Sequence, residues 1–203
     1  MLRRFLSDRS ATTAAEFALL LPLTVLFLLG IIDAGRYAWE FNKAEKATQA
    51  GARHAVVTDM VPSGLANYSF AVQGGIVQGN TVPITKFGGM VCTDNAGTVS
   101  CTCIDANACA FPTTSSNAAF TAIVQRMQFI KPDIARANVR IEYLWSGLGY
   151  AGDPNGPDVS PLVNVQLQNM TFNSFVLFGR AVPLPTASYS LTLEDGIGTE
   201  SDG

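Results

Sequence analysis

Glu16 is the residue whose type is least expected at its position, because it directly precedes a long apolar run in TTAAEFALLLP. A carboxylate at the centre of a membrane-spanning helix costs about 2.5–3.5 kcal/mol, less near its end, so it needs a partner or water. One interpretation is that Glu16 marks the border of the membrane and is solvated there. The alternative is a cut after Ala11, which would give Thr12 a terminal ammonium and make Glu16 the fifth residue of the helix. The carboxylate would then favour the positive end of the helix dipole and neutralise the ammonium of a neighbouring subunit.

Four cysteines within a short stretch offer a second kind of chemistry: Cys92, Cys101, Cys103 and Cys109. An even number of cysteines in a domain outside the cytoplasm predicts disulfides. Cys101 and Cys103 are poorly placed to bridge each other, which leaves two pairings open: Cys92–Cys101 with Cys103–Cys109, or Cys92–Cys103 with Cys101–Cys109. A zinc site is the rival interpretation, but the spacing matches no usual zinc pattern. The predicted disulfides close short loops and would staple one loop rather than the whole fold.

Residues for catalysis are scarce. His54 is the one histidine of the sequence, and on a helix we expect it to be a surface or packing residue. No serine–histidine–aspartate or cysteine–histidine set can be assembled from the sequence, and no phosphate-binding loop or dinucleotide fingerprint is present. The net charge of −3 gives no strong attraction for nucleic acid. We therefore expect no enzyme, no cofactor, no metal site, no nucleic-acid partner and no small-molecule substrate.

The charge-free stretch at residues 17–32, FALLLPLTVLFLLGII, predicts a transmembrane helix. Its 16 residues span roughly 24 Å as a helix, short of the roughly 30 Å hydrocarbon core. Extension to Trp39 gives 23 residues and about 35 Å, enough to cross. The extension contains Asp33 and Arg36, which can pair on one helix face. Tyr37 and Trp39 then lie where interfacial aromatic residues belong.

Flanking charges predict the orientation of this span. Arg3, Arg4 and Arg9 precede it against the single acid Asp8, whereas charges of both signs follow it. The positive-inside rule therefore places the N-terminus in the cytoplasm and the C-terminal domain outside. A cleaved secretory signal peptide is the alternative, but its usual apolar core is about 7–15 residues and is followed by a small-x-small site. Here the apolar core is longer, and the small residues that follow it, Ala34 and Gly35, have bulky or charged neighbours.

The membrane helix is expected to continue outward, as one helix from about residue 12 to 58, ended by the turn VPSG at 61–64. Small or apolar residues recur at a spacing of three and four along this second half. They are Phe41, Ala44, Thr48, Gly51, Ala52, Ala55 and Val56. This stripe indicates a stalk that packs on its own domain, with a dedicated surface between subunits as the less favoured alternative.

The rest of the chain predicts an α+β domain. Residues 117–130 have helical periodicity and a capping Asn117, with Pro132 following. Residues 138–145, 162–172 and 187–193 alternate between apolar and polar types and predict strands. Residues 65–116 indicate short strands and loops. We therefore expect a long N-terminal helix packed on a mostly antiparallel sheet, with a disulfide-stapled loop.

The N-terminal quarter resembles the TadE-like pseudopilins, minor pilin-like components of the tight-adherence (Flp-type) pilus machinery of bacteria. The matching pieces are the basic leader, Glu16-Phe17-Ala18, Leu21-Pro22, GIIDAGR at 30–36 and AGAR at 50–53. The resemblance implies cleavage by a prepilin peptidase between Ala11 and Thr12, with Glu16 as the glutamate that registers subunits in the membrane. The residue before the cut is most often glycine in this family, and here it is Ala11.

These observations together predict four segments: a basic leader that is removed (1–11), a transmembrane helix (12–39), a stalk helix (40–60) and an extracytoplasmic α+β domain (61–203). The expected protein is a minor pseudopilin of the bacterial inner membrane that acts in assembly or priming of a tight-adherence pilus or secretion system. Its expected partners are the inner membrane, the prepilin peptidase and other pilin-like subunits. The alternative function is an uncleaved, single-pass periplasmic binding or envelope protein.

Overall fold

The computed structural model describes residues 9–196 of the chain, and side chains from Thr13 onward. The described chain forms two compact units. Within the described residues, the first unit contains 9–40 and Thr171–Leu184, and the second contains Phe41–Met170 and 185–196. Residues 1–8 of the predicted leader (1–11) lie outside the described part of the chain.

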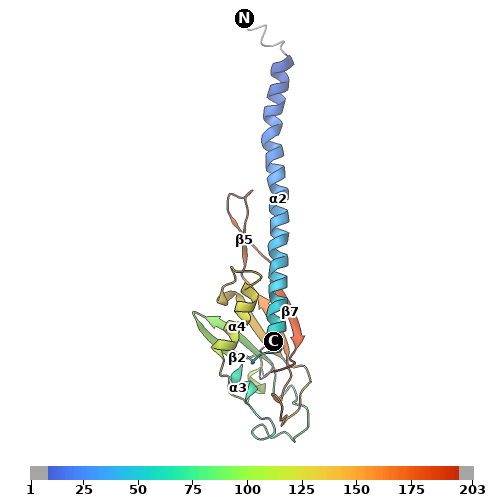
Figure 1. Cartoon of the computed structure of the whole chain (residues 1–203), viewed down its shortest axis with the longest axis vertical. Coiled ribbons are helices and arrows are strands. Elements are labelled where there is room, and N and C mark those ends of the chain that lie inside the picture. Colours follow the sequence, from blue (N-terminus) through green and yellow to red (C-terminus); the bar gives the residue numbers. More distant parts are fainter. Residues whose placement is uncertain (1–8, 197–203) are drawn as a thin grey trace. The chain divides into compact units, whose positions relative to one another are not determined.

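Helix α2 (Arg9–Ala55) is the long helix that the sequence predicts (Figure 1), and it ends three residues before the expected position. The apolar and alanine-rich composition favours a helix throughout, and Pro22 is the one proline inside it. After Ala55 the chain turns away, because the Val56 carbonyl accepts the backbone amides of Glu194 and Asp195 at 2.9 and 2.8 Å. Those two bonds replace the next helical hydrogen bonds and fix the helix end beside the C-terminal strand.

In the first unit, a short hairpin lies alongside α2 (Figure 1). Its strands β5 (Thr171–Asn173) and β6 (Ala181–Pro183) pair antiparallel, with Phe172 opposite Val182. The sequence predicts one continuous strand over 162–172, and this prediction is wrong at residues 168–170. Asn169 there adopts a left-handed conformation with φ 57°, which breaks the extended strand and sends the chain into the hairpin.

In the second unit, five strands form one antiparallel sheet in the order β2-β1-β3-β4-β7. Their bounds are β1 Met90–Asn95, β2 Thr98–Cys103, β3 Val139–Leu144, β4 Leu162–Leu167 and β7 Ala187–Thr192. Strands β3, β4 and β7 lie where the alternating segments predict them. Alternation in β3 and β4 buries one face of the sheet and leaves a polar one, as expected for an antiparallel sheet with one solvated side.

The polar face of the sheet is held by side-chain hydrogen bonds across strands. Glu142 is its centre: the carboxylate accepts from Arg140 and from the amides of Asn164 and Gln166, each at 2.9 Å. On the opposite face, Tyr143 is fully buried and its hydroxyl accepts the backbone amide of Val61 at 3.1 Å. Burial raises the pKa of Tyr143 well above its usual range.

The C-terminal part of α2 packs on the buried face of this sheet together with helix α4 (Asn117–Gln128). Gly51 marks the closest approach, because a Cβ placed there would lie 2.7 Å from the Met127 Cγ and 3.4 Å from a Val165 methyl. Nearly all of the predicted stripe is buried, with Ala44, Thr48 and Ala52 each 2% exposed or less. The stalk therefore packs on its own domain, as the favoured interpretation of the sequence states.

Short helices lie in the connections between the longer elements of the second unit. They are α3 (Ser63–Ala66), η1 (Ala106–Ala108) and η2 (Arg136–Asn138). The α4 helix starts where its sequence predicts, but the residue that caps it is Ser116 rather than Asn117: the Ser116 hydroxyl accepts the Ala119 amide at 3.1 Å. The predicted fold class, a long helix with an antiparallel α+β domain, is confirmed.

Candidate membrane and assembly site

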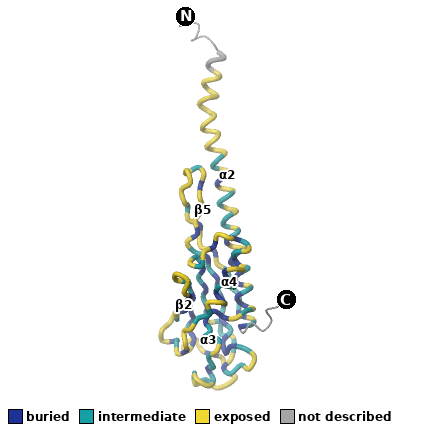
Figure 2. The backbone as a smooth tube through the Cα atoms, turned by 60° about the vertical axis from the view of Figure 1, so that its left-hand side comes forward, coloured by how far each residue is buried: buried dark blue, intermediate teal, exposed yellow. Residues whose placement is uncertain are grey.

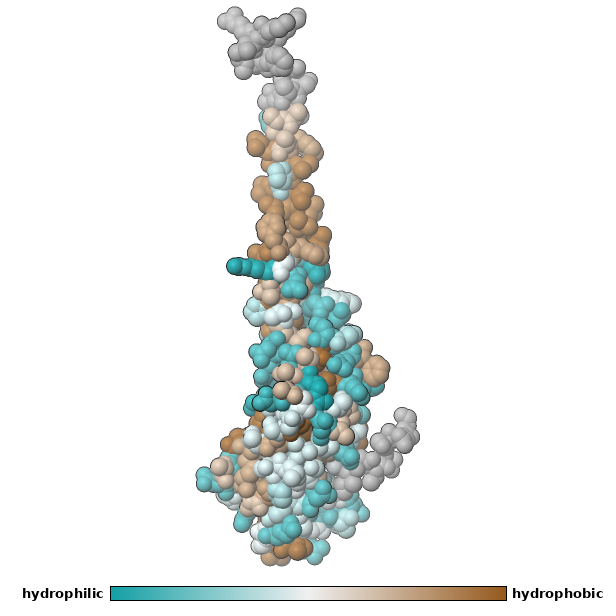
Figure 3. Space-filling model, turned by 90° about the vertical axis from the view of Figure 1, so that its left-hand side faces the viewer, coloured by the Kyte–Doolittle hydropathy of each residue, from teal (hydrophilic) through white to brown (hydrophobic). Residues whose placement is uncertain are grey.

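The N-terminal part of α2 presents its apolar side chains outward. In the described part of the chain, one helix is long and apolar enough to cross a membrane, and it lies within Thr13–Ala55. Phe17, Leu19 and Phe27 are each about two-thirds exposed or more. The backbone of this section is exposed along its length (Figure 2), and apolar side chains cover the face of the helix that Figure 3 shows. A surface of this size is stable in lipid and not in water, so it indicates a membrane anchor.

The polar side chain of this apolar section bonds within the helix. The Thr24 hydroxyl donates to the Leu20 carbonyl at 2.5 Å, which is the usual way for threonine to enter lipid within a helix. Pro22 lies inside the helix and has no amide to donate, so the Ala18 carbonyl one turn earlier loses its usual helical partner. Prolines are tolerated in membrane helices because neighbouring helices or local backbone adjustments satisfy the freed carbonyl.

Glu16 lies at the N-terminal end of this section, on the exposed surface of the first turns of α2. Ala11 and Thr12, the predicted processing site, have helical backbone, and their side chains lie outside the described ones. The three residues are thus on one continuous helix, with Glu16 four positions after Thr12. That spacing places the carboxylate about one turn from the position where a new N-terminus would form.

Asp33 is the first buried residue along α2 after the apolar section, with 7% of its surface exposed. Its carboxylate accepts the Ser174 hydroxyl at 2.7 Å and the Val176 backbone amide at 2.8 Å. Its other oxygen pairs with Arg36 at 3.2 Å, so the helical ion pair that the sequence predicts is present. We call this set of contacts the hairpin clamp, because it fixes the loop after β5 to α2.

Aromatic rings complete the hairpin clamp. The Arg36 guanidinium lies 4.0 Å from the Phe175 ring centroid and 4.9 Å from that of Phe172, within cation–π range. Tyr37 meets Phe172 edge to face at 5.8 Å, and its hydroxyl donates to the Pro183 carbonyl at 3.3 Å. Three residues of one helix face, Asp33, Arg36 and Tyr37, therefore hold both strands of the hairpin.

Sequence reasoning missed the hairpin half of this clamp. The helix residues are conspicuous, because charges directly after an apolar run need partners, but Ser174 and Phe175 lie about 140 positions away. The signal that could have indicated them is the apolar run SFVLFG at 174–179, which interrupts a polar region of the sequence. Nothing local in that run says which part of the chain it meets.

The cysteines form two disulfides, Cys92–Cys101 and Cys103–Cys109. This is the first of the two pairings that the sequence leaves open. Cys92 and Cys101 lie opposite each other in the β1–β2 register, so that bridge joins neighbouring strands at the sheet edge. The second bridge ties the end of β2 to the residue after η1. The sequence predicts a stapled loop, and the structure places the bridges at the edge of the sheet, with no free thiol among the described cysteines.

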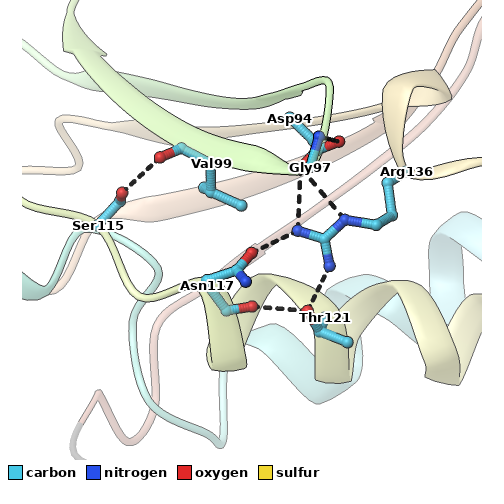
Figure 4. Close-up of polar contacts among 7 residues, drawn as sticks. All are labelled: Asp94, Gly97, Val99, Ser115, Asn117, Thr121 and Arg136. Atoms are coloured by element: carbon cyan, nitrogen blue, oxygen red, sulfur yellow. Dashed lines mark hydrogen bonds and ion pairs between the residues drawn. The ribbon is translucent and has the colours of Figure 1, made fainter.

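A polar cluster around Arg136 locks the β1–β2 hairpin to α4 (Figure 4). The guanidinium donates to Asp94 Oδ1 at 3.0 and 3.2 Å, to Asn117 Oδ1 at 2.5 Å, and to the Thr121 hydroxyl. Its flat face lies 5.3 Å from the Phe120 ring centroid. Because these donors are already used within the fold, the cluster supports the structure rather than offering a site for a ligand.

His54 lines a shallow groove of about 920 Å³ between α2 and α4, beside Arg53, Arg126 and Phe129. Burial, with a smaller contribution from the Arg126 charge, lowers the pKa of His54. The imidazole therefore stays neutral at ordinary pH. No group of three metal-binding side chains occurs anywhere in the part of the chain that the structure describes.

Residues 11–53 match the family model of the TadE-like proteins. The match covers the predicted cleavage bond, Glu16, the apolar section, Asp33 with Arg36, and most of the stalk, and it confirms the resemblance found in the sequence. The family connects this segment with tight-adherence pilus systems. No curated protein and no solved structure matches the chain.

Proposed function

We propose that this protein is a minor pseudopilin-like membrane protein that acts in assembly or priming of a tight-adherence (Flp-type) pilus or secretion system. The observation that carries the proposal is the TadE-like match over residues 11–53, which falls on a helix whose first part is apolar on its outer surface. A helix of this kind can be stored in the membrane and then packed against other pilin-like helices.

In this proposal a prepilin peptidase cuts between Ala11 and Thr12, at the cytoplasmic side of the inner membrane. The cut removes the basic leader and leaves an ammonium on Thr12. Glu16, one helical turn further along, then pairs with the terminal ammonium of a neighbouring subunit and sets the axial register between helices. The pair forms only after processing, so unprocessed subunits would carry an unpartnered carboxylate at the membrane border.

The second unit, which contains the five-stranded sheet, would remain in the periplasm, where the two disulfides are stable. In that oxidising compartment the disulfides stabilise the sheet edge without a bound metal. The role proposed here is structural, with no chemical step assigned to the protein.

The experiment that tests the proposal is Glu16→Gln, which keeps size and hydrogen bonding but removes the charge. We expect normal membrane insertion, normal cleavage and a strong loss of assembled pili. The matched control is Glu45→Gln, an exposed glutamate of the same helix outside the apolar section. Normal pilus output in the Glu16 variant would contradict the registration role, and it would favour an uncleaved envelope protein that shares only the anchor.

A further inference from the structure

The loop at the tip of the β5–β6 hairpin, residues 174–180, is mostly exposed (Figure 2), and it carries large apolar side chains. Phe178 is 97% exposed, the highest value among the exposed large hydrophobic residues of the described chain, and Phe175 and Leu177 are 59% and 49% exposed. A single exposed apolar residue needs no explanation, but three in four positions at one tip form a patch that water disfavours.

The backbone at this tip is also held in an unfavourable conformation. Phe178 has φ 52°, in the left-handed region that bulky residues rarely adopt. Glycine or asparagine would be the ordinary choice there. The loop nevertheless closes with regular hydrogen bonds, from the Gly179 amide to the Ser174 carbonyl at 2.7 Å and from the Phe178 amide to the Phe175 carbonyl at 3.1 Å. The fold thus tolerates strain in order to present an aromatic side chain outward.

The hairpin clamp fixes the position of this tip along α2. Asp33 binds the first residues of the loop, and Asp33 directly follows the apolar section that ends at Ile32. Ile31 and Ile32 are themselves more than half exposed on the helix. The apolar tip therefore lies at the level where the apolar surface of the helix ends, and the two surfaces belong to one unit.

We propose that the tip of the β5–β6 hairpin inserts into the phospholipid bilayer that α2 crosses, at the interface where the span ends. Phenylalanine and leucine enter the boundary between headgroups and acyl chains, to a depth of about 5–10 Å. Arg180, exposed at the end of the loop, can meet lipid phosphate. The inference rests on α2 as a membrane anchor and does not need the pilus role.

If the hairpin tip inserts into the bilayer, it defines how deeply α2 lies in the membrane. If the interface lies at Asp33, the residues in hydrocarbon are those before it, and residues 12–32 as a helix span about 32 Å, close to the roughly 30 Å core. Residues 33–39 then lie outside the hydrocarbon, in the part of α2 that contacts the hairpin. The hairpin also prevents the helix from moving further into the membrane, because the polar strands of the hairpin would then enter the hydrocarbon.

The test is a depth measurement in nanodiscs that hold one copy of the full chain. Because the described cysteines are all paired, Leu177→Cys can carry an environment-sensitive fluorophore at one site while Phe178 stays in place. Thr171→Cys, an exposed position at the base of the same hairpin, is the matched control. We expect blue-shifted emission and quenching by nitroxide-labelled lipids at position 177, and water-like emission without quenching at 171.

Two results would overturn the proposal. Water-like emission at position 177 would show that the tip stays in solvent. Blue-shifted emission that appears only with two copies in one disc, without quenching by lipid, would assign the tip to a second copy of the chain instead.

A second variant separates anchoring from folding. Phe178→Asn relieves the left-handed strain, so we expect an unchanged or higher unfolding temperature in detergent. The same change should strongly reduce lipid quenching of a fluorophore at Leu177→Cys, since the neighbouring anchor is gone. Equal quenching at 177 with and without Phe178 would contradict the assigned role of that side chain.

Discussion

Replacement of Asp33 with alanine should release the β5–β6 hairpin from α2 while both elements stay formed. The carboxylate accepts the buried Ser174 hydroxyl and the Val176 amide, and hydrogen bonds to a charged group contribute about 1.5–3 kcal/mol each. The Arg36 pair adds little, because the guanidinium is 40% exposed and such pairs contribute about 0–1 kcal/mol. A loss of about 3 kcal/mol is therefore expected, close to a hundredfold increase in local opening.

The assay is hydrogen exchange measured by mass spectrometry on the membrane-embedded chain. Peptides from 171–184 should exchange about a hundredfold faster in Asp33→Ala, while peptides from α4, residues 117–128, keep their rate. Arg36→Met should give a smaller change, about threefold to tenfold, because Asp33 keeps its two hydrogen bonds to the hairpin. Unchanged exchange of the hairpin in Asp33→Ala would show that the clamp does not hold it.

Three further predictions concern the stalk and the sheet. Gly51→Ala should lower the free energy of unfolding, measured by chemical denaturation, by about 1 kcal/mol, because crowding against Met127 outweighs the gain in helix propensity. Gly35→Ala should raise the same free energy, because a Cβ there meets open space. Tyr143→Phe should cost about 1–3 kcal/mol in the same assay, since a buried backbone amide loses its acceptor. Burial lowers the pKa of His54, so stability should be full above pH about 6.5 and fall below it, and His54→Gln should flatten that pH profile of the unfolding temperature.

Local patterns in the sequence predicted much of this fold. Alternation located β3, β4 and β7, because a one-sided sheet imposes a period of two on its residues. Helical periodicity located α4 and the buried stripe of the stalk. The Asp33–Arg36 pair followed from their spacing on one helix face. Each of these features depends on residues within a few positions of one another, and such features are readable without a structure.

The features that the sequence did not predict depend on distant contacts. The strand predicted through residue 172 breaks at Asn169, and the segment that follows belongs with α2 instead of the sheet. The partner of Asp33 is Ser174, which no periodicity connects to it. The pairing of the cysteines could be narrowed to two alternatives but not decided, because the register of β1 and β2 selects it.

The N-terminal sequence and intact mass of the membrane-extracted protein, from cells with and without the prepilin peptidase, decide whether the leader is removed. We expect a chain that starts at Thr12 only when the peptidase is present, and at Met1 when it is absent. A start at Met1 in both strains would contradict the pseudopilin assignment and leave an uncleaved membrane anchor. A start beyond residue 34 would instead identify an ordinary signal peptide and remove the membrane span altogether.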